Sequence, residues 1–170
     1  ACDTGKELAW FPGNGDGTFG AKQIIAGAGT TPAISKAYGV AAGDLDGDGD
    51  LDVVATEDIT GGLVKWWKND GLGKFASGSS IPVIVGVNRQ VAIGDVNGDG
   101  KNDIVSAISG QNKIGVAIND GTPTFAVRTF NNNGSMSAPN SVDLSDVNGD
   151  GRLDIITADT GANRVFAGIV

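Results

Sequence analysis

The chain has 170 residues, with 12 Lys and Arg against 20 Asp and Glu, which gives a formal charge of −8. This length fits one domain, and 40% apolar residues are enough to form a core. The sequence contains no histidine and one cysteine, Cys2. It therefore excludes His-dependent catalytic triads, His-ligated zinc, an internal disulfide and a cysteine metal cluster. The acidic balance argues against nucleic-acid binding, and no apolar run is long enough to cross a membrane as a helix.

The N-terminal segment, 1–37, is predicted to form a hairpin. The apolar runs 8–11 and 23–25 flank the sequence GNGDGTF, whose Asn, Asp and Gly residues are typical of a tight turn between strands. The segment 38–89 contains a similar turn, KNDGLGKF, and adds two strands and an aspartate-rich loop before it. Its expected strands are 38–43, 51–56 and 64–67.

The segment 90–139 repeats this order, with the turn INDGTPTF after its third strand. Its expected strands are 90–94, 103–107, 114–117 and 125–127. The segment 140–170 begins the order again, with strands expected at 140–144 and 153–158. Its end resembles the third-strand region near the N-terminus, so the sequence runs from the middle of one repeat to the middle of another.

Three aspartate-rich loops mark the repeat most clearly. They read GDLDGDGDLDVV, GDVNGDGKNDIV and SDVNGDGRLDII, and their first aspartates, Asp44, Asp95 and Asp146, are 51 residues apart each time. No segment carries the apolar period of an amphipathic helix, so the chain is predicted to be all-β. A β-sandwich seldom repeats strand by strand, and a β-helix repeats in fewer residues per coil. Four short antiparallel strands in about 50 residues are typical of one β-propeller blade.

The predicted fold is therefore a single domain of propeller-type, four-stranded antiparallel blades, about three blade equivalents in all. Its expected parts are a partial blade 1–37, whole blades 38–89 and 90–139, and a partial blade 140–170. Propellers close with about four to eight blades. The expected partners are consequently further blades of the same propeller, or identical protomers that pair through open edge strands.

Each aspartate loop predicts a calcium site. Side-chain oxygens recur at loop positions 1, 3, 5 and 9, and glycines at positions 4 and 6 allow the backbone to curl around an ion. Position 7 is Asp, Lys or Arg, so only its backbone carbonyl is expected to face the ion. The predicted ligands of the three loops are Asp44, Asp46, Asp48, Asp50 and Asp52; Asp95, Asn97, Asp99, Lys101 and Asp103; and Asp146, Asn148, Asp150, Arg152 and Asp154.

The spacing favours three Ca²⁺ over other metal sites. The carboxylate at position 9 is expected to close the shell with both oxygens. An EF-hand needs flanking helices and a carboxylate at position 12, where these loops have Ala55, Ser106 and Thr157. Magnesium keeps several waters and rarely takes an all-protein cage. The alternative is that the loops are plain Gly-Asp turns.

The three loops, together with Phe19-Gly20-Ala21 after the first hairpin, resemble the FG-GAP/VCBS repeat family, which includes the blades of integrin α-subunit propellers. The resemblance covers nearly the whole chain, although Phe75-Ala76 and Phe125-Ala126 depart from the FG dipeptide. It implies a secreted or cell-surface, calcium-stabilised module for adhesion, carbohydrate binding or scaffolding. It also implies that the ions are structural and that the loops are not catalytic.

Two rival functions stay open. One is an accessory part of a larger secreted enzyme that degrades polysaccharides. The other is a glycosidase that uses an acid pair, although Glu7 and Glu57 are the only glutamates. Possible ligands of a recognition module are glycans or a surface protein.

Three weaker patterns concern the tryptophans, a glycosylation sequon and a group of lysines. The tryptophans suit a sugar-stacking platform, but blade packing is the favoured interpretation for all three, Trp10, Trp66 and Trp67. Asn133 begins the sequon Asn-Gly-Ser and is a possible glycosylation site. The lysines around the second hairpin are expected to form a solvated face: Lys65, Lys68 and Lys74.

Overall fold

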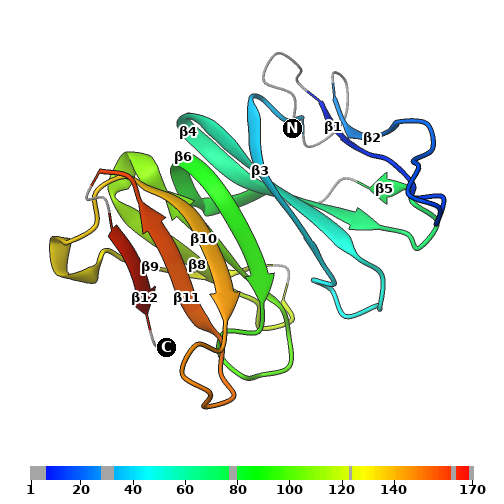
Figure 1. The fold of residues 1–170 in the computed structure, drawn as a ribbon. Helices are drawn as coiled ribbons and strands as arrows, with labels where there is room; N and C mark the ends of the chain where they lie inside the picture. The colour runs from blue at the N-terminus through cyan, green and yellow to red at the C-terminus, as the bar shows by residue number, and fades with distance from the viewer. Residues whose placement is uncertain (1–6, 28–32, 77–79, 123, 162–163, 169–170) are drawn as a thin grey trace.

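The computed structural model describes residues 7–27, 33–76, 80–122, 124–161 and 164–168, and this part of the chain is all-β with antiparallel sheets (Figure 1). The prediction of the fold class is confirmed. The helical residues here form two 3-10 segments, η1 (Ser109–Gln111) and η2 (Asn132–Gly134), and no helix in the described ranges is long and apolar enough to cross a membrane. Cys2 lies outside the described residues.

The strands group into three sheets. The strands are β1 (Leu8–Trp10), β2 (Gln23–Ala26), β3 (Ala37–Gly43), β4 (Asp52–Asn69), β5 (Phe75–Ala76), β6 (Ser80–Gly94), β7 (Asp103–Ile108), β8 (Lys113–Ile118), β9 (Ala126–Phe130), β10 (Pro139–Ser145), β11 (Asp154–Asp159) and β12 (Arg164–Gly168). β1 pairs with β2, and β10, β11 and β12 form a second sheet. The central sheet has the order β3-β4-β6-β7-β8-β9, with β5 paired to β4.

Strand β4 folds back on itself. The Asp52 carboxylate at its start accepts a hydrogen bond of 2.9 Å from the backbone N–H of Asn69 at its end. Halfway along, Leu63 N–H donates to Glu57 Oε2 at 3.1 Å, and Gly61 has a positive φ of 75°. Glycine suits this conformation because it has no Cβ to clash. β4 therefore provides both the second and the third strand that the sequence predicts for this blade.

Strand β6 connects two blades. Its first half pairs with β4, for example Ile81 with Val64, and its second half pairs with β7, for example Val91 with Ser106. It thus serves as the last strand of one four-stranded unit and the first strand of the next. The predicted blade boundary between residues 89 and 90 lies inside β6, and the exact bounds of the blades stay a prediction.

Glycines allow the first strands of neighbouring blades to approach closely. A Cβ at Gly43 in β3 would lie 2.6 Å from Ile93 Cγ2, and a Cβ at Gly94 in β6 would lie 2.8 Å from Leu153 Cδ1. Real Cβ atoms do not tolerate such contacts, so with a side chain at either position the neighbouring Ile93 or Leu153 side chain would have to shift. The two glycines are 51 residues apart, so the packing between blades follows the same period as the sequence.

Three apolar clusters form the core, and the tryptophans contribute to two of them. Trp67 is buried, with 1% of its surface exposed. Trp66 packs at the margin of the central cluster and meets Phe125 edge-to-face, with ring centroids 6.2 Å apart. Trp10 packs against the N-terminal cluster. The favoured interpretation as core is confirmed for Trp67, whereas Trp10 and Trp66 pack against the core and are partly exposed.

Candidate metal-binding loops

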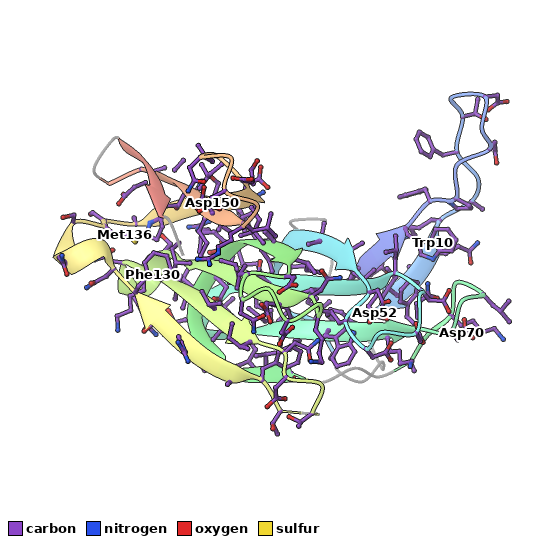
Figure 2. The ribbon with its side chains drawn as sticks, turned by 90° about the horizontal axis from the view of Figure 1, so that it is seen from below. Trp10, Asp52, Asp70, Phe130, Met136 and Asp150 are labelled. Carbon is purple, nitrogen blue, oxygen red and sulfur yellow. The ribbon has the colours of Figure 1, made fainter. Side chains whose placement is uncertain are left out.

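The three aspartate loops project from one edge of the sheets. They follow β3, β6 and β10 and lead into β4, β7 and β11, and all three lie along the lower side in Figure 1. Figure 2 looks onto this side, with Asp52 between the strands at the centre and Asp150 on the C-terminal loop. The repeat in sequence therefore becomes a row of equivalent loops on one face.

The aspartate at position 1 organises the backbone of each loop. Asp44 accepts from Gly47 N–H at 2.7 Å and from Gly49 N–H at 2.9 Å. Asp95 and Asp146 accept from the corresponding glycines of their own loops at 2.7–2.8 Å. The glycines at positions 4 and 6 all have positive φ, as their sequence positions predict: Gly47, Gly49, Gly98, Gly100, Gly149 and Gly151.

These backbone donors stabilise the ionised form of the position 1 aspartates. The N–H of Gly100 is the main reason why the pKa of Asp95 lies below its ordinary value; desolvation opposes it, and the N–H of Gly98 adds a smaller lowering effect. The pKa of Asp146 is lowered in the same way, first by Gly151 N–H. Both loops therefore present negative charge at their centre.

The aspartate at position 9 is buried. Asp52, Asp103 and Asp154 are exposed by 0, 0 and 1%, and each accepts a hydrogen bond of 3.0–3.1 Å at Oδ2 from the backbone N–H at position 2 of its loop. In the first two loops Oδ1 accepts from the N–H of Asn69 or Asn119 in the next hairpin, at 2.9 and 2.8 Å.

Burial is the main reason why the pKa of Asp52 and of Asp103 is raised. Oδ1 and Oδ2 of these two aspartates each accept one hydrogen bond and keep a second lone pair. The binding of calcium by both oxygens of position 9 therefore stays a prediction. In the third loop, no donor among the described residues contacts Asp154 Oδ1. For the third loop, the residue that corresponds to Asn119 is Val170, which lies outside the described residues.

In the first loop, three carboxylates lie close together and a lysine contacts two of them. Oxygens of Asp44, Asp46 and Asp48 lie within 4.8 Å of one another. The Lys68 ammonium contacts Asp46 Oδ2 and lies 3.1 Å from Asp48 Oδ2. Its hydrogen bonds to Asp46 and Asp48 raise the pKa of Lys68.

In the second and third loops, position 3 is an asparagine instead. Its amide donates to the aspartate at position 5, from Asn97 to Asp99 at 3.1 Å and from Asn148 to Asp150 at 3.2 Å. At position 7 of the second loop, Lys101 Nζ lies 3.8 Å from Asp99 Oδ2. The role of the position 7 carbonyls stays a prediction.

The residues fit a hard divalent cation. The converging donors are oxygens, the loop backbone curls around them, and in the first loop an ammonium group already lies where positive charge is favoured. Calcium requires about six to eight oxygen ligands, which the five predicted positions can supply if position 9 is bidentate.

Comparison with known protein families gives three matches to the FG-GAP-like repeat, over residues 1–55, 44–106 and 95–157. The chain belongs to the FG-GAP-like repeat family. A search of curated proteins finds no match. The successive matches overlap at the aspartate loops, and they support a repeat module of β-propeller type. The family is generally non-catalytic. The more specific resemblance to VCBS repeats and to integrin propellers stays a prediction.

Two asparagines of the FG-GAP-like repeats were missed by the sequence analysis as members of the site. Asn119 Nδ2 donates to Leu45 O of the first loop at 2.7 Å, and Asn102 Nδ2 donates to Asp44 O at 2.9 Å. The first loop is thus tied to the next repeat. The recurrence of Asn in NDG at Asn69 and Asn119 was the available signal, but it was assigned to turn formation alone.

The expectation of a solvated basic face was wrong for Lys65, and Lys68 is solvent-exposed but also pairs with acidic residues. Lys65 Nζ lies 2.6 Å from Glu57 Oε1, and its side chain is 12% exposed. Lys68 contacts the first loop, as described above. The local sequence does not indicate which acidic groups lie next to these lysines, because the partners are brought close only by the folding of β4 and of the first loop.

A cavity of about 510 Å³ lies between the first loop and the hairpin of the next repeat. Its lining combines aromatic rings with amide and charged groups, including Asp46, Trp66, Lys101, Asn102, Asn119 and Phe125. One wall of this cavity is therefore formed by the first loop itself.

The sequon residue Asn133 lies in η2 and is exposed, as are Gly134 and Ser135. The site is accessible, and its glycosylation stays a prediction.

Proposed function

We propose that this chain is a non-catalytic, extracellular calcium-binding module of an FG-GAP propeller, in which one Ca²⁺ in each loop rigidifies the hairpin between the first two strands of a blade. The observation that carries this proposal is the convergence of Asp44, Asp46 and Asp48 within 4.8 Å, with a lysine ammonium beside two of them. When bound, calcium would supply a divalent positive charge that offsets the repulsion among these carboxylates.

The charge of the chain supports this proposal. Half of its 20 acidic residues are aspartates at positions 1, 3, 5 and 9 of the three loops. Clustered carboxylates repel one another, and three Ca²⁺ would reduce the formal charge from −8 to about −2. The pairing of open strand edges with further blades or with identical protomers stays a prediction.

Calorimetric titration of the calcium-free protein should give three equivalents of bound Ca²⁺. Asp48→Ala, Asp99→Ala and Asp150→Ala remove the position 5 carboxylate of one loop each, and each variant should lose one equivalent. Asp143→Ala is the matched control, because Asp143 is an exposed aspartate in β10 outside the loops. An absence of binding at millimolar calcium, checked by elemental analysis, would contradict the proposal.

A second candidate function, glycan recognition, is favoured by the cavity beside the first loop. Protein sites for sugars and other small molecules combine apolar rings with a few placed polar groups, as the rings of Trp66 and Phe125 and the amides of Asn102 and Asn119 do here. Such a site would suit an adhesion module or the accessory part of a polysaccharide-degrading enzyme.

A glycan array should therefore show saturable binding that Lys101→Ala weakens. This substitution removes a side chain that lines the cavity but keeps the backbone carbonyl predicted at position 7. Lys113→Ala, in β8 and outside the cavity lining, is the control. Equal binding by both variants would remove the cavity from consideration.

A further inference from the structure

Lys68 joins the hairpin of its blade to the first aspartate loop. It lies near the end of β4, and its ammonium contacts Asp46 Oδ2 and lies 3.1 Å from Asp48 Oδ2. Its side chain is 45% exposed, so the ammonium group can also turn into solvent. These two carboxylates are side-chain ligands that the proposed calcium ion requires.

The next repeat has no lysine at this place. Asn69 and Asn119 correspond, because each donates its backbone N–H to the position 9 aspartate of its own repeat, Asp52 or Asp103. The residue before Asn119 is Ile118, where the first repeat has Lys68. A lysine at this position of the hairpin is therefore specific to the first of these two repeats.

The lysine accompanies an additional carboxylate. Position 3 is Asp46 in the first loop and Asn97 in the second, so the first loop has one more negative charge among its side-chain ligands. The Lys68 ammonium offsets that charge. Without calcium, the first loop has a positive charge within contact distance of two carboxylates. In the second loop, Lys101 Nζ is 3.8 Å from a single carboxylate, Asp99.

We propose that Lys68 is a built-in counter-ion of the first loop that competes with calcium for Asp46 and Asp48, so that this loop binds calcium more weakly than it would without the lysine. The inference rests on the proposed function. The ammonium group occupies Oδ2 of both carboxylates, and it would repel a calcium ion bound at such a short distance. Calcium binding therefore favours the displacement of Lys68 into solvent, and the loss of its two ion pairs reduces the net gain in free energy.

The size of the effect follows from the exposure of the pair. Exposed ion pairs contribute little each, but here one ammonium contacts two carboxylates and also repels a divalent ion. Together these effects correspond to about a tenfold change in calcium affinity at low salt. High salt should reduce the difference, because exposed charges are screened.

Calcium titration of Lys68→Met tests the inference. Methionine keeps the length and apolar stem of the side chain and removes its charge. The site of the first loop is the one that Asp48→Ala abolishes, and we expect Lys68→Met to strengthen calcium binding at that site by about tenfold. Lys74→Met is the matched control, because it removes a lysine from the same hairpin without an ion pair to the loop among the described residues.

A second measurement does not depend on calcium. In excess chelator, Lys68→Met should lower Tm by a few degrees relative to the wild type and to Lys74→Met, because the carboxylates of the first loop lose their counter-ion. If the wild type and Lys68→Met bind calcium with equal affinity at every site, competition by Lys68 is wrong while the proposed function stands. If the wild type binds no calcium in any loop, the proposed function fails as well.

Discussion

Excess EDTA should lower the Tm of this FG-GAP-like protein by about 15–30 °C relative to a calcium-saturated sample. A ligand that binds only the folded state contributes about 2.7 kcal/mol when its concentration is a hundred times Kd. Three such ions give roughly 8 kcal/mol, and a domain of this size changes its Tm by about 2–4 °C for each kcal/mol. Differential scanning calorimetry with calcium and with chelator measures the shift directly.

Variants divide this shift among the loops. Asp99→Ala should remove about a third of the calcium-dependent shift, because it takes the position 5 carboxylate from the second loop only. Asp143→Ala should keep the whole shift. Magnesium at the same concentration should restore little of it, because that ion retains its waters. Identical melting curves with and without EDTA would show that the loops hold the fold together without any metal.

The sequence was sufficient to predict the fold because its repeat is encoded in local chemistry. Gly47 and Gly49 adopt positive φ, and the corresponding glycines recur 51 residues later, so the turn positions could be identified from the residues alone. The strands between the turns followed from their apolar runs. The sequence did not predict that β4 and β6 would each continue through two strand positions, because that depends on pairing register between distant segments.

The site was predictable only in part, for the same reason. The aspartates of one loop are neighbours in sequence, so their convergence could be expected. Lys68 lies 20 residues or more from Asp46 and Asp48, and Asn119 reaches back to Leu45 of the previous repeat. No local pattern identifies such partners, because the packing of one blade against the next brings them together.

The structure also separates positions that the sequence treated alike. Asp99 at position 5 is exposed, whereas Asp103 at position 9 has no exposed surface. The cause is that β7 begins at Asp103 and the first residues of that strand are covered by the next hairpin. Position 9 therefore has a structural role that does not require an ion.

Asp103→Ala should accordingly destabilise the protein by about 2–6 kcal/mol even in EDTA. The Asp103 carboxylate accepts from Val96 N–H at 3.0 Å and from Asn119 N–H at 2.8 Å. Alanine would leave both buried donors without a partner, at about 1–3 kcal/mol each. Urea denaturation followed by circular dichroism, with chelator present throughout, measures the loss.

Two comparisons isolate this cause. Asp99→Ala in EDTA should cost far less, because its hydrogen bonds to Lys101 N–H and Asn97 Nδ2 are exposed and water can replace them. Asp103→Asn should fall between the two, since its amide oxygen can accept one N–H while its NH₂ group faces the other donor. If Asp103→Ala and Asp99→Ala were equally stable in EDTA, the position 9 aspartate would act through calcium alone, and the hydrogen bonds that join the loop to the next hairpin would contribute nothing measurable.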